Sequence, residues 1–134
     1  MKPGSIMPPT LNRMVYLTLR GIKLSRDIAT LASLHPNSLV EVHPGAVIGS
    51  RLSPKDLDYV LAYKKEEDLE ARKALLEWLG QQHLIGIPKT AAEQSHSIDA
   101  CAVALGAWHW KNPAFTPEWR FPAKLPLHPF DYCC

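Results

Sequence analysis

Two acidic side chains stand at positions from which they could do chemistry together. Glu41 lies near the end of a short apolar run, Leu39–His43, and Asp99 begins an apolar helical pattern, three residues after His96. Residues three apart share one side of a helix, so His96 and Asp99 are expected to be neighbours. If this helix packs across the end of the strand, two carboxylates and an imidazole converge. Such an oxygen-rich pocket suits Mg²⁺ or Mn²⁺, which activate water and neutralise charge on a phosphodiester.

Each of these residues also has a purely structural interpretation. An acid in the first turn of a helix is favoured there by the helix dipole, whatever its function. The cations Lys64 and Arg72 could bind a phosphate or pair with the acids, or they could be solvated surface residues. The sequence contains no nucleophile elbow, phosphate-binding glycine loop, dinucleotide fingerprint or zinc-finger spacing.

The elements that must position these residues follow from hydrophobic periodicity and capping signals. At 134 residues the chain is long enough for one domain with a core. The patterns predict a helix-rich α/β fold with one clear strand at about 38–43 and a weaker strand at 119–121 or 84–87. Helices are predicted at about 11–33, 54–64, 66–79 and 96–110.

The last part of the chain, residues 112–134, has a different composition. It holds five prolines together with aromatic residues, and proline at this density forbids regular helix. We expect a domain over 1–111, followed by an extended tail that wraps the body by its aromatic side chains or is partly disordered.

Charge and cysteine usage exclude several classes of protein. The formal charge is +2, from 15 Lys and Arg against 13 Asp and Glu, which argues against a strongly basic DNA-binding module. No apolar run approaches the roughly 18 residues that a membrane span needs, and the first residues carry no apolar leader segment. The three cysteines fit neither a disulfide framework nor a zinc site, so we expect a reduced, cytoplasmic protein without a membrane partner.

Three motifs, in order along the chain, resemble one family. They are Glu-Val-His-Pro-Gly-Ala at 41–46, Tyr63-Lys64 followed by Arg72, and the stretch 96–105 that contains His96 and Asp99. Together, over about residues 8–110, they resemble domain-of-unknown-function family 429, a predicted RNase H-like nuclease family related to Holliday-junction resolvases. The resemblance implies a five-stranded mixed sheet with helices on both faces, and a divalent metal held by carboxylates.

The family pattern assigns roles to particular residues. The metal site of the family consists of three acids: one on the first strand, a Glu that ends the fourth strand, and one near the start of the last helix. Glu41 and Asp99 match the second and third as metal ligands and catalytic residues, with His96 as a helper. Lys64 and Arg72, whose roles the pattern does not assign, are the candidates for contacting the phosphates of a nucleic acid substrate because of their positive charge.

One departure from the pattern lowers the expected activity. The first strand and its acid would lie before residue 8, where only MKPGSIM stands, so we expect an N-terminally truncated, incomplete RNase H-like domain. Two carboxylates hold a metal poorly, which predicts weak or absent phosphodiester hydrolysis with Mg²⁺ or Mn²⁺. The alternative is a non-catalytic interaction module that uses the exposed edge of the Leu39–His43 strand and the aromatic tail, with a homo-oligomer as one outcome.

Overall fold

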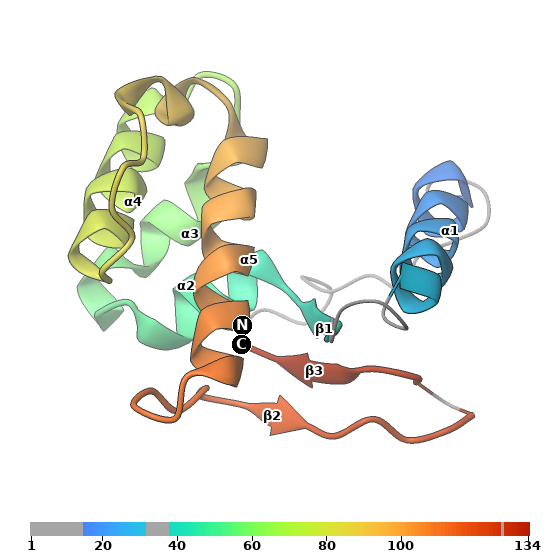
Figure 1. Ribbon diagram of the computed structural model, residues 1–134. Coiled ribbons are helices and arrows are strands. Elements are labelled where there is room, and N and C mark those ends of the chain that lie inside the picture. Colours follow the sequence, from blue (N-terminus) through green and yellow to red (C-terminus); the bar gives the residue numbers. More distant parts are fainter. Residues whose placement is uncertain (1–14, 32–37, 127) are drawn as a thin grey trace. The chain divides into compact units, whose positions relative to one another are not determined.

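The computed structural model describes residues 15–31, 38–126 and 128–134, which belong to two compact units, Met1–Leu39 and Val40–Cys134 (Figure 1). The described part of the first unit contains helix α1 (Val15–Leu31), which confirms the central part of the predicted helix. The predicted ends of this helix, at 11–14 and 32–33, lie outside the described residues. Along its apolar stripe, Leu24 and Leu31 remain more than half exposed.

The second unit has an α/β fold. Its helices confirm the predictions to within a few residues, although the predicted helix at 54–64 is divided into a short 3-10 turn and an α-helix. In chain order the elements are β1 (Val40–Val42), α2 (Pro44–Arg51), η1 (Pro54–Asp56), α3 (Leu57–Ala62), α4 (Leu69–Gln81), η2 (Lys89–Glu93), α5 (Ser95–Lys111), β2 (Arg120–Phe121) and β3 (Asp131–Cys133).

The strands form a small mixed sheet in the order β1-β3-β2. Strand β1 runs parallel to β3, with Glu41 opposite Tyr132, and β2 runs antiparallel to β3. Strand β1 confirms the clear strand prediction, and β2 confirms the weaker one at 119–121, whereas residues 84–87 form no strand. Strand β3 was not predicted, yet it is the middle strand. The proline-rich segment 112–134 therefore contributes β2 and β3 to the sheet.

Helix α2 lies outside the helices predicted from the sequence. Pro44 occupies the first helical position, where its fixed φ is favourable and its missing N–H is not needed. His43 is the N-cap, and its Nδ1 atom accepts a hydrogen bond of 3.1 Å from the backbone N–H of Ala46. The imidazole therefore starts a helix, and strand and helix follow each other without a loop.

The core of the second unit lies where helices α2, α4 and α5 meet (Figure 1). Each fully buried aliphatic side chain there contributes about 1.5–3 kcal/mol to folding. The largest such side chains are Val47, Ile48, Leu75, Leu79, Ile98 and Leu105. A Cβ atom on Gly106 would lie 2.8 Å from Val42 Cγ1, so only glycine allows α5 to approach β1 this closely. In the described part of the chain, no helix has the length and apolar character needed to cross a membrane.

Candidate functional site

Asp99 lies near the start of α5 and is the centre of a polar cluster. Its Oδ1 atom accepts a hydrogen bond of 2.8 Å from the Tyr63 hydroxyl, and its Oδ2 atom forms an ion pair with the Lys64 ammonium. His96 Nδ1 is 3.8 Å from Oδ2, on a side chain that is largely exposed. The predicted proximity of His96 and Asp99 is therefore present. We call these four residues, Tyr63, Lys64, His96 and Asp99, the Asp99 cluster.

The turn that follows α3 carries Tyr63 and Lys64 to Asp99, and Arg72 holds this turn in place. The Arg72 guanidinium is buried and donates hydrogen bonds to the carbonyl oxygens of Tyr63 (3.2 Å), Lys65 (2.5 Å) and Glu66 (3.0 Å). Its Nε atom also donates to the carbonyl oxygen of Ala92 (2.8 Å), just before α5 begins. One side chain thus ties the Tyr63–Lys64 turn to the segment that leads into the Asp99 helix.

Electrostatics fix the protonation state of the Tyr63 hydroxyl. Burial raises the pKa of Tyr63 above its ordinary value, and the hydrogen bond to the Asp99 carboxylate raises the pKa further. The Tyr63 hydroxyl is therefore protonated near neutral pH and donates its hydrogen bond to Asp99. The Asp99 carboxylate, one-fifth exposed, receives this hydrogen bond on one oxygen and the positive charge of Lys64 on the other.

Glu41 occupies a different part of the second unit. Its side chain is exposed on β1, opposite Tyr132 in β3. The next residue, Val42, packs against Gly106 of α5, which is seven residues and about 10 Å of helix beyond Asp99. Figure 1 shows β1 beside the later part of α5, while the helix starts at the other end of the unit. The structure therefore does not bring Glu41 into the Asp99 cluster.

The oxygen atoms near Asp99 decide whether a divalent metal could bind there. Both oxygens of Asp99 already have donors, and Lys64 places a positive charge where a cation would bind. Among residues 15–31, 38–126 and 128–134, no group of three or more His, Cys, Asp and Glu side chains could hold a metal ion. The residues as arranged do not fit a Mg²⁺ or Mn²⁺ site.

The two cations expected to bind substrate have different surroundings. Lys64 is half-exposed and pairs with an acid, which is one of the three roles expected for it. Arg72 is buried, and its guanidinium donates to backbone carbonyl oxygens, which makes it a residue that positions the turn. The hydroxyl of Tyr63 was the contribution that sequence reasoning missed. Its position next to Lys64 in the motif was the available signal, but only the fold shows that it contacts Asp99.

The fold and the cluster describe an α/β domain with an acid held near the start of its last helix. Residues 11–118 match the family model described as Protein of unknown function (DUF429). This match covers most of the chain, so the chain belongs to the DUF429 family. No match to the chain is found among curated proteins or among solved structures.

Proposed function

We propose that this DUF429 chain is an RNase H-like domain related to nucleases, and that its own hydrolysis of nucleic acid phosphodiesters is weak or absent. Membership of the family and the order of the motifs around Glu41, Tyr63 and Asp99 support the relationship to nucleases. One observation supports the low activity. Asp99 is paired with Lys64 and Tyr63, whereas Glu41 lies on β1 opposite Tyr132.

The physical reason is competition for the carboxylate. A nuclease of the expected type needs several carboxylates on one ion, and a metal at Asp99 would have to displace the Lys64 ammonium. Lys64 is half-exposed, so its removal should leave the surrounding fold intact and free one oxygen of Asp99. The resemblance implies Mg²⁺ or Mn²⁺ held by Glu41 and Asp99, with His96 as helper, but Glu41 lies outside the Asp99 cluster, so we propose no hydrolysis through an ion shared by these two carboxylates.

The first experiment measures cleavage by the purified full chain. Fluorescent single-stranded and double-stranded DNA and RNA are incubated with Mn²⁺ or Mg²⁺, and the Asp99→Asn, Glu41→Gln and Glu77→Gln variants run beside the wild type. Glu77 is an exposed carboxylate on α4 and serves as the matched control. Cleavage by the wild type is expected to stay near background. Strong cleavage that Asp99→Asn or Glu41→Gln abolishes, while Glu77→Gln retains it, would show that the weak-activity proposal is wrong.

A second experiment asks whether Asp99 is a masked metal ligand. Lys64→Ala removes the competing cation, and a ligand that binds only the folded state raises the melting temperature. We expect millimolar Mn²⁺ to raise the melting temperature of Lys64→Ala more than that of the wild type. The double variant Lys64→Ala/Asp99→Asn should lose this gain. If the melting temperature of Lys64→Ala is the same with and without Mn²⁺, Asp99 is not a metal ligand.

A second candidate function is a non-catalytic protein-interaction module. Among the described residues β1 pairs with β3 alone, so its outer edge retains unpaired backbone groups that another strand could pair with. This module would bind a partner strand and would not respond to metal. A melting temperature that Mn²⁺ leaves unchanged in both the wild type and Lys64→Ala favours the module over the nuclease relative.

A further inference from the structure

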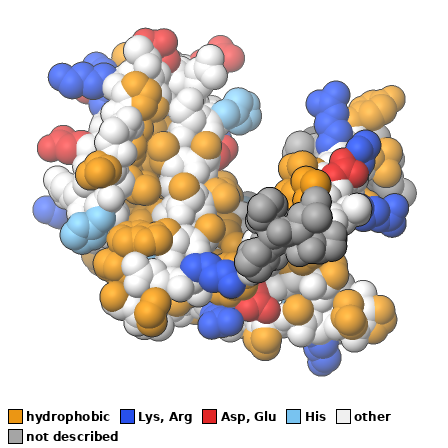
Figure 2. Space-filling view, in the orientation of Figure 1, with side chains coloured by type: hydrophobic (Ala, Val, Ile, Leu, Met, Phe, Trp, Pro, Cys, Tyr) orange, Lys and Arg blue, Asp and Glu red, His pale blue; other side chains and the backbone are white. Residues whose placement is uncertain are grey.

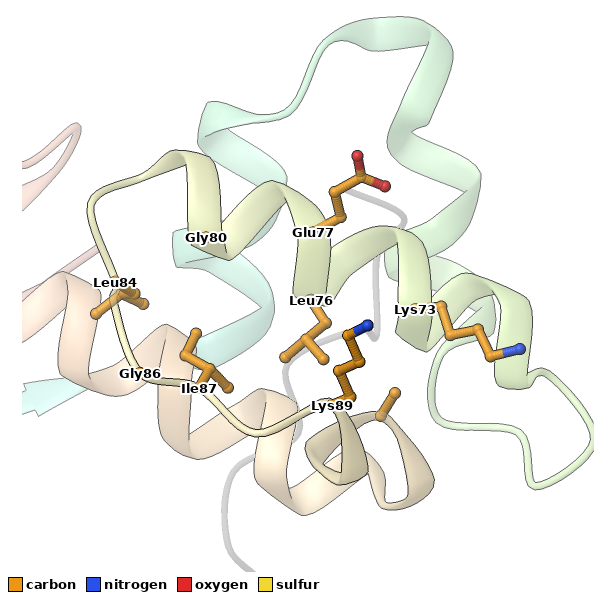
Figure 3. Close-up of a pocket in the computed structure, with 9 residues that line it drawn as sticks. Lys73, Leu76, Glu77, Gly80, Leu84, Gly86, Ile87 and Lys89 are labelled. Atoms are coloured by element: carbon orange, nitrogen blue, oxygen red, sulfur yellow. The ribbon is translucent and has the colours of Figure 1, made fainter.

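A groove runs between helix α4 and the segment that follows it, within the second unit (Figure 3). Its volume is about 450 Å³. Leu76 of α4 forms one side, Leu84 and Ile87 form the other, and Ala92 of η2 also lines the groove. On the face shown in Figure 2, hydrophobic side chains gather over α4 and α5 between charged ones. The groove is thus an apolar surface that can bury a small apolar side chain.

Ile85 lies at the edge of this groove and points away from the protein. It is 94% exposed, although its neighbours Leu84 and Gly86 both line the groove. The backbone on either side is left-handed, with φ of 66° at His83 and 77° at Gly86. A non-glycine residue in this region costs about 1–3 kcal/mol, so surrounding contacts must fix it. The His83 ring, with its centroid 6.3 Å from that of Trp108, helps to hold this turn, which presents Ile85 to solvent.

The rim of the groove carries opposite charges on its two sides. Glu77 stands on α4, and Lys89 stands at the start of η2 (Figure 3). Neither forms an ion pair within the described part of the chain, whereas the neighbouring Lys73 is paired with Glu70 at 2.8 Å. A partner that places a positive group opposite Glu77 and a negative group opposite Lys89 would form an ion pair with each of them.

We propose that this groove is the interface of a weak two-fold dimer of the chain. A two-fold axis beside Ile85 lets the Ile85 side chain of each copy enter the groove of the other. The same axis reverses the order of the rim charges, so Glu77 of each copy meets Lys89 of the other. A second copy is the occupant that supplies the exposed isoleucine and both complementary charges together. Because the contact consists of one small apolar groove, one isoleucine and two rim charges per copy, we expect a weak dimer that dissociates reversibly.

Sedimentation velocity of the full chain from 10 µM to 1 mM tests this dimer. Wild-type protein is expected to show a concentration-dependent rise in mass toward the dimer. Ile85→Asp should raise the dissociation constant by about tenfold or more, because it places a charge in the apolar groove. Leu61→Asp is the matched control, since Leu61 is an exposed side chain of α3 outside the groove, and it should leave the dissociation constant unchanged. Ile85→Asp should keep the wild-type melting temperature, because Ile85 makes little contact within its own chain.

Charge reversal gives a second, independent test. Glu77→Lys and Lys89→Glu should each weaken the dimer, because each places like charges opposite one another across the interface. The double variant Glu77→Lys/Lys89→Glu restores opposite charges and should bring the dissociation constant back to within about threefold of the wild type. A wild type that stays monomeric at 1 mM overturns the proposal, as does equal association of Ile85→Asp and Leu61→Asp. A double variant no better than the single variants also overturns it. None of these results depends on metal or nuclease activity.

Discussion

Arg72→Ala tests whether one buried guanidinium positions the Asp99 cluster. Arg72 donates to four carbonyl oxygens, and those of Lys65 and Glu66 lie in a partly exposed turn that water can reach. The bonds to Tyr63 and Ala92 are buried, so the substitution leaves these two oxygens unsatisfied. An unsatisfied buried acceptor costs about 1–3 kcal/mol, which gives an expected loss of about 2–6 kcal/mol in the free energy of unfolding.

The assay is urea unfolding followed by circular dichroism, with Lys73→Ala as the matched control. Lys73 is the next residue on α4 and carries the same charge, but it is exposed and paired with Glu70 at the surface, so its loss should cost less than about 0.5 kcal/mol. Arg72→Lys keeps the charge but cannot reach all four carbonyls and should fall between the two. A loss below 1 kcal/mol in Arg72→Ala, or equal losses in Arg72→Ala and Lys73→Ala, would refute the positioning role.

Two further predictions concern packing and pH. Gly106→Ala should lower the free energy of unfolding by about 1–3 kcal/mol in the same urea assay, because the new Cβ would meet Val42. The control is Gly80→Ala, which places a Cβ in open space on α4 and should be neutral or stabilising. Equal effects of the two substitutions would contradict the close approach of α5 to β1. Burial, with the nearby Arg51 charge, lowers the pKa of His109 in the folded protein, so the unfolded chain binds this proton more readily. The free energy of unfolding of the wild type should therefore fall as the pH drops below about 6.5, and that of His109→Gln should fall less. Identical profiles of unfolding free energy for the wild type and His109→Gln from pH 8 to 5 would contradict this prediction.

Much of the helical framework could be predicted because its signals are local. Ser53-Pro54 marks the start of a helical segment, and the apolar spacing of Ile98, Ala102 and Leu105 identifies the buried face of α5. Helix α2 is not among the predicted helices although its signals are also local, because a proline that follows a strand is compatible both with a turn and with the first position of a helix.

Pairing in the sheet could not be predicted in the same way. Strand β3 is three residues long in a proline-rich segment, and it becomes a strand through its partners β1 and β2. A short strand has little intrinsic preference, so its existence depends on contacts with residues far away in the chain.

The sequence by itself determined that this protein has amphipathic helices, a β-branched strand with Glu41, and His96 beside Asp99 on one helix. Spacing along a helix is enough for that last contact, because three residues make nearly one turn. Only the tertiary structure decided that Tyr63 and Lys64, more than thirty positions earlier, occupy the two oxygens of Asp99 while Glu41 lies beside Tyr132. The physical reason is that a carboxylate is satisfied by whichever donors the packing of helices brings to it, and the packing depends on the shape of the whole core.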